Sequence, residues 1–171
     1  MGEIYLFTGP GGGKTTNALG LALRSMGHGH KVIIIQFMKW WKQTGEYKIQ
    51  KKLGELYEIY QFGRKGWIGL DNLTDEDREL AKKAIEFTEK IVEKKRPKLL
   101  VLDELNLAAY CKLVSIIDIV RFLNKMKRYD MTIVITGRNA SKELEDAADY
   151  VNVIDARKIP KKIKSTKGIQ W

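Results

Sequence analysis

The chain of 171 residues has little of several features that would each indicate a particular class of protein. Its one cysteine, Cys111, excludes an internal disulfide framework and a zinc site built from cysteines. No apolar run approaches the roughly 20 residues that cross a bilayer, so we expect no membrane contact. The first residues lack the basic start and the small-residue cleavage site of a signal peptide. These absences predict a cytoplasmic protein.

Acidic residues are also scarce. The chain has 21 Asp and Glu against 31 Lys and Arg, which gives a formal net charge of +10. Much of this excess lies beside glutamate in segments of helical period, as in Glu86–Lys90, which is typical of a solvated, ion-paired surface. Only the segment 158–164 concentrates lysine enough to steer an anionic ligand or an acidic protein.

Apolar runs rich in β-branched residues alternate with segments of helical period. Strands are predicted at 4–8, 31–37, 57–62, 98–102, 132–136 and 150–154. Helices are predicted at 15–26, 46–53, from a capping box at 74–77 to the region before Pro97, 115–127 and 141–147, with a loop over 64–73. The first helix is expected to bury Leu19, Ala22, Leu23 and Met26. This alternation predicts an α/β fold, with a mostly parallel sheet covered by helices on both faces, in one domain over 1–171.

A glycine-rich segment joins the first expected strand to the first expected helix. It reads Gly9, Pro10, Gly11, Gly12, Gly13, Lys14, Thr15, Thr16. Glycines let backbone amides approach phosphate oxygens closely, and the helix N-terminus adds positive potential. Lys14 adds a cation and Thr15 a hydroxyl for Mg²⁺. The segment therefore predicts a P-loop that binds ATP, in a P-loop NTPase architecture of the RecA-like type, although it is one residue shorter than G-x-x-x-x-G-K-[ST].

Two carboxylates, Asp103 and Glu104, follow the expected strand 98–102. This is the Walker B pattern, in which one carboxylate holds Mg²⁺ directly or through water and the other orients a water or a second ligand. Thr15, Asp103 and Glu104 are therefore the predicted metal site, and the spacing leaves open which carboxylate touches the metal. The carboxyl ends of parallel strands form the edge of a sheet where ligands bind.

Two arginines are candidates for phosphate contacts. Arg138 follows the expected strand 132–136, where it either clamps a phosphate with two hydrogen bonds or lies on the surface. Arg24 shares one face of the first helix with Asn17 and Gly20, and it either reaches the ligand or pairs with an acid. The sequence leaves both choices open.

Taken together, these motifs resemble the ATP:corrinoid adenosyltransferase family, of the kind that acts on cob(I)yrinic acid a,c-diamide. The resemblance covers nearly the whole chain, and the short loop is itself a mark of the family. The segments that carry it are Phe7–Gly9, Gly13–Thr16, Ala22–Gly29, Val32–Phe37, Leu102–Leu105, Ile135–Arg138 and Lys167–Trp171.

The resemblance implies transfer of the 5′-deoxyadenosyl group of ATP to the Co(I) of a reduced corrinoid, with release of triphosphate. Co(I) attacks C5′ itself, so the protein works by positioning and by stabilising the leaving triphosphate. Lys14, the loop amides, Mg²⁺ and Arg138 fit that role, with the triphosphate held in the polarity opposite to that in kinases. The resemblance also implies a homodimer and an electron-donor protein that serves the reduction of cobalt.

Family members place aromatic residues under the corrinoid to displace its lower axial ligand, which eases reduction of Co(II). The corresponding segment here is 62–69, and Trp67 is the candidate, with packing of its own loop as the alternative. The best-known members carry two aromatics spaced by one residue, whereas this chain has Gly69 at the second position. Because the first strand begins close to Met1, we expect Trp40, Trp41 or the tail to close the corrinoid site.

Two other functions are compatible with a P-loop. A nucleoside kinase would use Glu104 as a base at the acceptor hydroxyl and would release ADP instead of triphosphate; the single cysteine rules out the zinc lobe of a thymidine-kinase-like enzyme. A non-catalytic, ATP-dependent nucleic-acid-binding module would explain the net charge. However, the lysines are not interleaved with aromatic residues for base stacking, so nucleic acid is not an expected partner.

Overall fold

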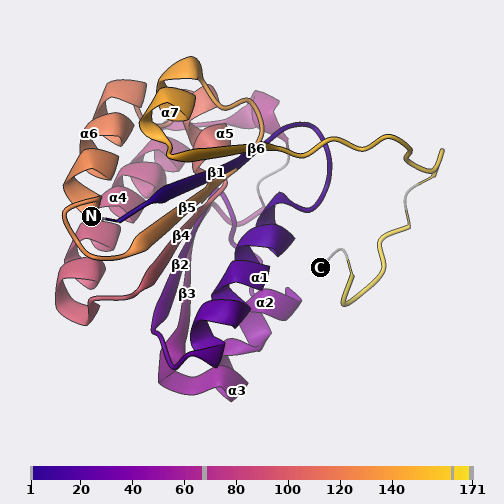
Figure 1. Ribbon diagram of the computed structural model, residues 1–171. Coiled ribbons are helices and arrows are strands. Elements are labelled where there is room, and N and C mark those ends of the chain that lie inside the picture. Colours follow the sequence, from indigo (N-terminus) through magenta and orange to yellow (C-terminus); the bar gives the residue numbers. More distant parts are fainter. Residues whose placement is uncertain (1, 67–68, 163, 170–171) are drawn as a thin grey trace.

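A single parallel sheet organises the chain. The computed structural model describes residues 2–66, 69–162 and 164–169. Within them a six-stranded sheet runs in the order β3-β2-β4-β5-β1-β6, and each pairing between neighbours is parallel (Figure 1). The strands are β1 (Ile4–Thr8), β2 (Val32–Phe37), β3 (Tyr57–Phe62), β4 (Leu99–Asp103), β5 (Thr132–Thr136) and β6 (Tyr150–Val153). Each strand lies within one residue of its predicted bounds.

Helices cover both faces of this sheet (Figure 1). On one face α1 (Lys14–Gly27) packs against β2, β4 and β5, near the short α2 (Gly45–Lys48) and α3 (Gln50–Leu53). On the other face α4 (Asp75–Lys95) packs against β2 and β3. The elements that complete the described fold are α5 (Leu105–Tyr110), α6 (Ile116–Met126), α7 (Lys142–Ala147) and the 3₁₀ turns η1 (Gly54–Leu56) and η2 (Leu70–Asn72).

Alternate side chains of the central strands supply two apolar cores, one on each face of the sheet. Val32 and Ile34 of β2 pack on the α1 side, whereas Ile33 and Ile35 pack on the side of α4 to α7. All six residues of β2 are buried. A strand buried on both faces reads as a continuous apolar run, and this is why its position was predictable.

Three details of the predicted helices were wrong. Leu23 of α1 is 66% exposed, because the helix packs through the small residues Ala18 and Ala22, which lie one turn apart. The predicted helix 46–53 is two short helices that meet at Ile49. Helix α5 was not predicted, since six residues are too few to show a helical period.

The strand order determines which loops meet at the carboxyl edge. Strand β5 lies between β1, which leads into the glycine loop, and β4, which ends at Asp103. Strand β2 lies on the other side of β4. The residues that follow β1, β2, β4 and β5 therefore converge at one edge, where ligands of open α/β sheets bind.

Candidate functional site

The glycine loop is shaped by its contact with the chain that follows β6. Gly9 has φ +101°, and a Cβ placed there would lie 2.4 Å from the carbonyl oxygen of Ile154. The backbone N–H of Gly11 donates to the same oxygen at 2.9 Å. Gly13, with φ +110°, is the N-cap of α1. Gly9 and Gly13 therefore have conformations that side chains rarely adopt, and Gly9 also has no room for one.

The same geometry predicts that the loop glycines differ in their tolerance to substitution. Gly9→Ala is expected to lower stability by about 1–2 kcal/mol from its positive φ alone, with a further cost from the overlap with Ile154. Gly12→Ala is the matched control, because nothing lies within 4 Å of a Cβ at Gly12. Thermal unfolding of both variants checks this. Equal stability of the two would contradict the loop conformation described here.

Lys14, at the start of α1, folds back over the loop. Its side chain is largely buried, and Nζ donates to the carbonyl oxygens of Gly9 at 2.7 Å and of Gly11 at 2.6 Å. Burial and the nearby Arg138 guanidinium lower the pKa of Lys14, while Glu104 opposes them. The loop thus holds an ammonium group over its own backbone, and a bound polyanion would strengthen the charged form.

Asp103 lies at the end of β4, is fully buried, and accepts hydrogen bonds from four side chains. Oδ1 accepts from the hydroxyls of Thr15 at 2.8 Å and Thr136 at 2.7 Å. Oδ2 accepts from Gln36 Nε2 at 3.0 Å and Lys39 Nζ at 2.6 Å. Two carboxylate oxygens have about four acceptor positions, so Asp103 is saturated by the protein.

These contacts determine the protonation states of Asp103 and Lys39. Burial raises the pKa of Asp103, but the Lys39 ammonium and the donated hydrogen bonds outweigh it and lower the pKa overall. For Lys39, burial lowers the pKa, and the Asp103 carboxylate outweighs this and raises it. Lys39 and Asp103 are therefore an ion pair at neutral pH.

Glu104 differs from its neighbour. It has φ +64°, and its backbone N–H donates to Thr136 Oγ1 at 3.0 Å. Burial, followed by the charge of Asp103, raises the pKa of Glu104. Among the described residues its carboxylate accepts no side-chain hydrogen bond, so its oxygens are available to a ligand. The spacing in the sequence could not tell which of the two carboxylates is free to bind a ligand. The hydrogen-bond partners of Asp103 and Glu104 in the structure distinguish them.

Arg138 lies at the same edge, immediately after the turn at Gly137. Gly137 has φ +134°, and a Cβ there would approach Asn106 and the Leu107 nitrogen to 2.9 Å. The Asn106 amide donates to the carbonyl oxygen of Gly137 at 3.0 Å, which anchors the turn. The Arg138 side chain is exposed, and its charge contributes to the lowered pKa of Lys14. Arg138, Lys14 and Glu104 thus act on one another electrostatically.

The other predicted site residues have different positions. Thr16 lies in the first turn of α1, where its hydroxyl donates to Gly13 O at 3.0 Å, and Pro10 is exposed in the loop. Arg24 lies in the last turn of α1, ten residues or about 15 Å of helix from Lys14, and the structure does not bring it to the loop. Trp67 lies outside the described residues.

Sequence reasoning did not select Gln36 and Lys39. Gln36 was detectable as a polar residue within an apolar strand, since such a residue needs a buried partner. Lys39 gave no comparable signal, because its importance depends on β2 lying beside β4. Gln61 completes the group by donating to Gln36 Oε1 at 2.9 Å.

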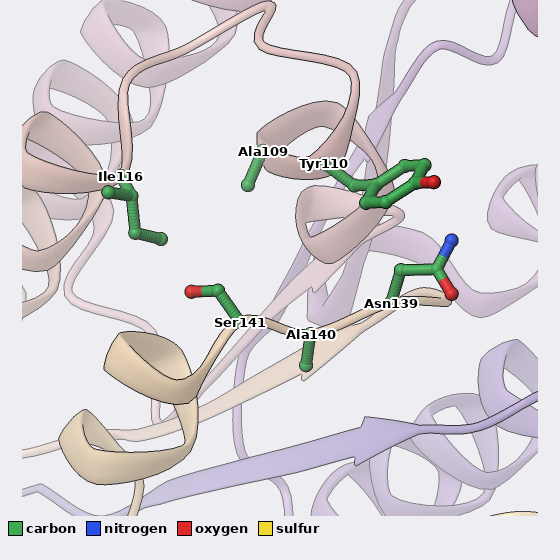
Figure 2. A pocket seen from close by; sticks show the side chains of 6 residues that line it. All are labelled: Ala109, Tyr110, Ile116, Asn139, Ala140 and Ser141. Atoms are coloured by element: carbon green, nitrogen blue, oxygen red, sulfur yellow. The ribbon is translucent and has the colours of Figure 1, made fainter.

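A separate pocket is lined in part by the residues that follow Arg138 in the chain. Figure 2 shows it between the end of α5, the start of α6 and the connection from β5 to α7. Its volume is about 300 Å³, and its lining residues are Ala109, Tyr110, Ile116, Asn139, Ala140 and Ser141. The lining carries no group charged at neutral pH, so this pocket offers no cation to a phosphate.

No group of three or more His, Cys, Asp or Glu side chains that could hold a metal ion occurs in 2–66, 69–162 and 164–169. A cation near Asp103 and Glu104 would therefore also need hydroxyl, phosphate and water ligands, which is how Mg²⁺ binds in P-loop proteins. Within the same described ranges, no helix combines the length and the apolar character that crossing a bilayer requires.

The parallel sheet, the glycine loop between β1 and α1, and the aspartate at the end of β4 define the class of the protein as P-loop α/β. A solved structure of a KaiC-like protein from Pyrococcus horikoshii shares the fold, with a TM-score of 0.56 and 18% identity over 89% of this chain and 70% of that one. The predicted fold class is confirmed.

Sequence comparison then gives the family. The pattern of the family "ATP:corrinoid adenosyltransferase BtuR/CobO/CobP" matches residues 1–171. A corrinoid adenosyltransferase from a Sinorhizobium species is 32% identical over 173 residues, covering 99% of this chain and 80% of the relative. One from Pseudomonas aeruginosa is 30% identical over 177 residues, covering 99% and 84%. The chain belongs to the ATP:corrinoid adenosyltransferase family, as its motifs predicted.

Proposed function

We propose that this chain transfers the 5′-deoxyadenosyl group of ATP to the Co(I) of a corrinoid such as cob(I)yrinic acid a,c-diamide and releases triphosphate. The observation that carries the proposal is the position of Lys14 over the glycine loop, with Thr15 bonded to Asp103, in a chain of this family. The reaction would serve adenosylcobalamin synthesis or salvage.

In this reaction no side chain of the protein needs to act as the nucleophile. The electron pair of Co(I) forms the bond to C5′, while the bond between C5′ and its oxygen breaks and triphosphate leaves with the electrons of that bond. Negative charge grows on the leaving group, and Lys14, the loop amides and Arg138 are the groups that would stabilise it. We propose that the triphosphate lies with C5′ directed out of the loop, toward the corrinoid.

The residues present fit a Mg²⁺ ion. The Thr15 hydroxyl donates a hydrogen bond to Asp103 at 2.8 Å, which leaves the lone pairs of its oxygen for other partners. Among the described residues, the Glu104 carboxylate accepts no side-chain hydrogen bond. We propose that Thr15 and Glu104 hold the metal and that Asp103 orients Thr15, since its own acceptor positions are filled. When bound, Mg²⁺ would supply positive charge to the leaving triphosphate.

Incubation with ATP, Mg²⁺ and a chemically reduced corrinoid tests the proposal. We expect the absorption spectrum of a cobalt–carbon bond and, by phosphorus NMR, triphosphate as the phosphate product. Release of ADP would instead indicate a kinase and would contradict the proposal, as would an unchanged corrinoid spectrum beside intact ATP.

Trp67 is proposed to displace the lower ligand of the corrinoid cobalt, a step that matters only when Co(II) must be reduced. Trp67→Ala is therefore expected to reduce the rate far more in assays that start from Co(II) and a reductant than in assays that start from Co(I). Trp41→Ala is the control, because a tryptophan that only covers the corrinoid would change both rates alike. Equal loss of rate in both assays would refute this role for Trp67.

We propose that residues 1–171 act as one ATP-binding domain, in a cytoplasmic homodimer that receives electrons from a donor protein. Light scattering of the purified chain checks the dimer.

A further inference from the structure

The cation that neutralises Asp103 is a lysine on a neighbouring strand end. Lys39 lies two residues after β2, and its Nζ is 2.6 Å from Asp103 Oδ2 and 3.4 Å from Thr15 Oγ1. Thr15 Oγ1 is the hydroxyl that the proposed Mg²⁺ site uses. The ammonium of Lys39 therefore donates to the same oxygen that a metal ion would need.

The backbone holds Lys39 in this position. Met38 has φ +58° and is 8% exposed, and its N–H donates to Phe62 O at 2.9 Å. Gly63 lies against the peptide between Met38 and Lys39, and a Cβ on Gly63 would come within 2.4 Å of the Met38 carbonyl carbon. A non-glycine residue in this conformation persists only where its surroundings enforce it. The turn after β2 is thus constrained to direct Lys39 toward Asp103.

The position of Lys39 makes it the cation of this site. Its Nζ forms an ion pair with the fully buried Asp103 carboxylate at 2.6 Å. A Mg²⁺ ion binds a hydroxyl oxygen at about 2.0–2.1 Å. If Lys39 stayed in place, the two cations would share one oxygen ligand and would repel each other strongly across a poorly screened distance.

We propose that Lys39 keeps free divalent cations away from Thr15, and that it yields this position only when the metal arrives with the triphosphate. The oxygens of the triphosphate then accept the displaced ammonium, so that its charge stays paired. The consequence is a chain that binds the metal–nucleotide complex but binds the metal alone poorly. This inference rests on the proposed function, because it assumes the Thr15 metal site described above.

Titration with Mn²⁺ in the absence of nucleotide, followed by electron paramagnetic resonance of the free ion, tests the inference. Lys39→Met is expected to bind Mn²⁺ at least about tenfold more tightly than the unmodified chain, because one cation is removed from beside a divalent ion. Lys39→Arg, which keeps the charge, and Lys83→Met, which removes a charge from exposed α4, should both bind Mn²⁺ as weakly as the unmodified chain. Unchanged Mn²⁺ affinity in folded Lys39→Met would overturn the proposal.

Because Lys39→Met leaves Asp103 without its cation and is open to failure of folding, a second measurement uses the unmodified chain. NMR of lysine ammonium groups, with Lys39 assigned from the signal that Lys39→Arg loses, reports where this group lies. We expect ATP with Mg²⁺ to shift the signal and excess Mg²⁺ alone to leave it in place. A comparable shift with Mg²⁺ alone would contradict the inference.

Neither measurement contains a corrinoid, so the two hypotheses can fail separately. A chain that shows the lysine effect but forms no cobalt–carbon bond contradicts only the proposed activity. A chain that forms the bond, but whose Mn²⁺ affinity is the same before and after the Lys39→Met substitution, contradicts only the role of Lys39.

Discussion

Lys14→Ala is expected to lower the rate of adenosyl transfer by about 10²- to 10³-fold, the usual effect of removing one donor that stabilises a developing anion. Lys14 is the cation that folds back over the loop from the start of α1, and its Nζ already lies within hydrogen-bond distance of two loop carbonyls, at 2.7 and 2.6 Å. A leaving triphosphate that is not neutralised there retains more negative charge, so the bond to C5′ breaks more slowly. Steady-state kinetics with Co(I) corrinoid measure the loss.

The control for this variant is Lys83→Ala, which removes the same charge from the exposed side of α4. We expect the Lys83 variant to keep its activity, because it alters net charge without altering the loop. Thermal unfolding of both variants separates a catalytic effect from a structural one, since Lys14→Ala also removes a donor from Gly9 and Gly11. Near-normal turnover by folded Lys14→Ala would refute the assignment of the loop.

Asp103→Asn is expected to cost about 3 kcal/mol of stability, at the lower end of the range for breaking a buried ion pair, because Lys39 is able to turn toward solvent. The amide can replace only one of the two acceptor oxygens, and its NH₂ group would face the donors of Gln36 or Thr15. Chemical denaturation at neutral pH measures the difference. Asp130→Asn is the matched control, since Asp130 pairs with Lys98 on the surface, and little change is expected there.

The same variant alters how stability depends on pH. The pKa of Asp103 is lower in the folded chain than the value of about 3.9 in an unfolded one. Its stabilising contribution is therefore fully present above that unfolded value and is lost as the pH falls toward the folded pKa. Asp103→Asn should remove this part of the acid dependence. If the free energy of unfolding fell with the same slope in acid for the unmodified chain and for Asp103→Asn, Asp103 would not be held as a charged group.

Much of the site was predictable because its parts have local sequence patterns. The glycine loop is recognised by its closely spaced glycines followed by a lysine and a threonine. Asp103 and Thr136 each end a continuous apolar run. Parallel strands bring their carboxyl ends to one edge, so these residues had to lie near one another once the sheet was recognised. The loop, the acidic pair and Arg138 could therefore be assigned to one edge, although their contacts could not.

The other contacts of the site, and the burial of individual helix residues, depend on strand order and packing. Local sequence patterns do not predict either of these. Lys39 meets Asp103 only because β2 is the neighbour of β4, and nothing in the spacing between residues 39 and 103 indicates that. Leu23 looked like a core residue, but Ala18 and Ala22 allow α1 to approach the sheet and leave Leu23 at 66% exposure. Apolar character alone does not tell which of two adjacent helix faces is inward.

A crystal structure of the chain with ATP and Mg²⁺ tests the central proposal most directly. The account predicts the three phosphates within hydrogen-bond distance of the amides of the glycine loop and of Lys14 Nζ, with C5′ facing away from the loop. A triphosphate bound elsewhere, or one in the loop with its γ-phosphate facing outward as in a kinase, would contradict it.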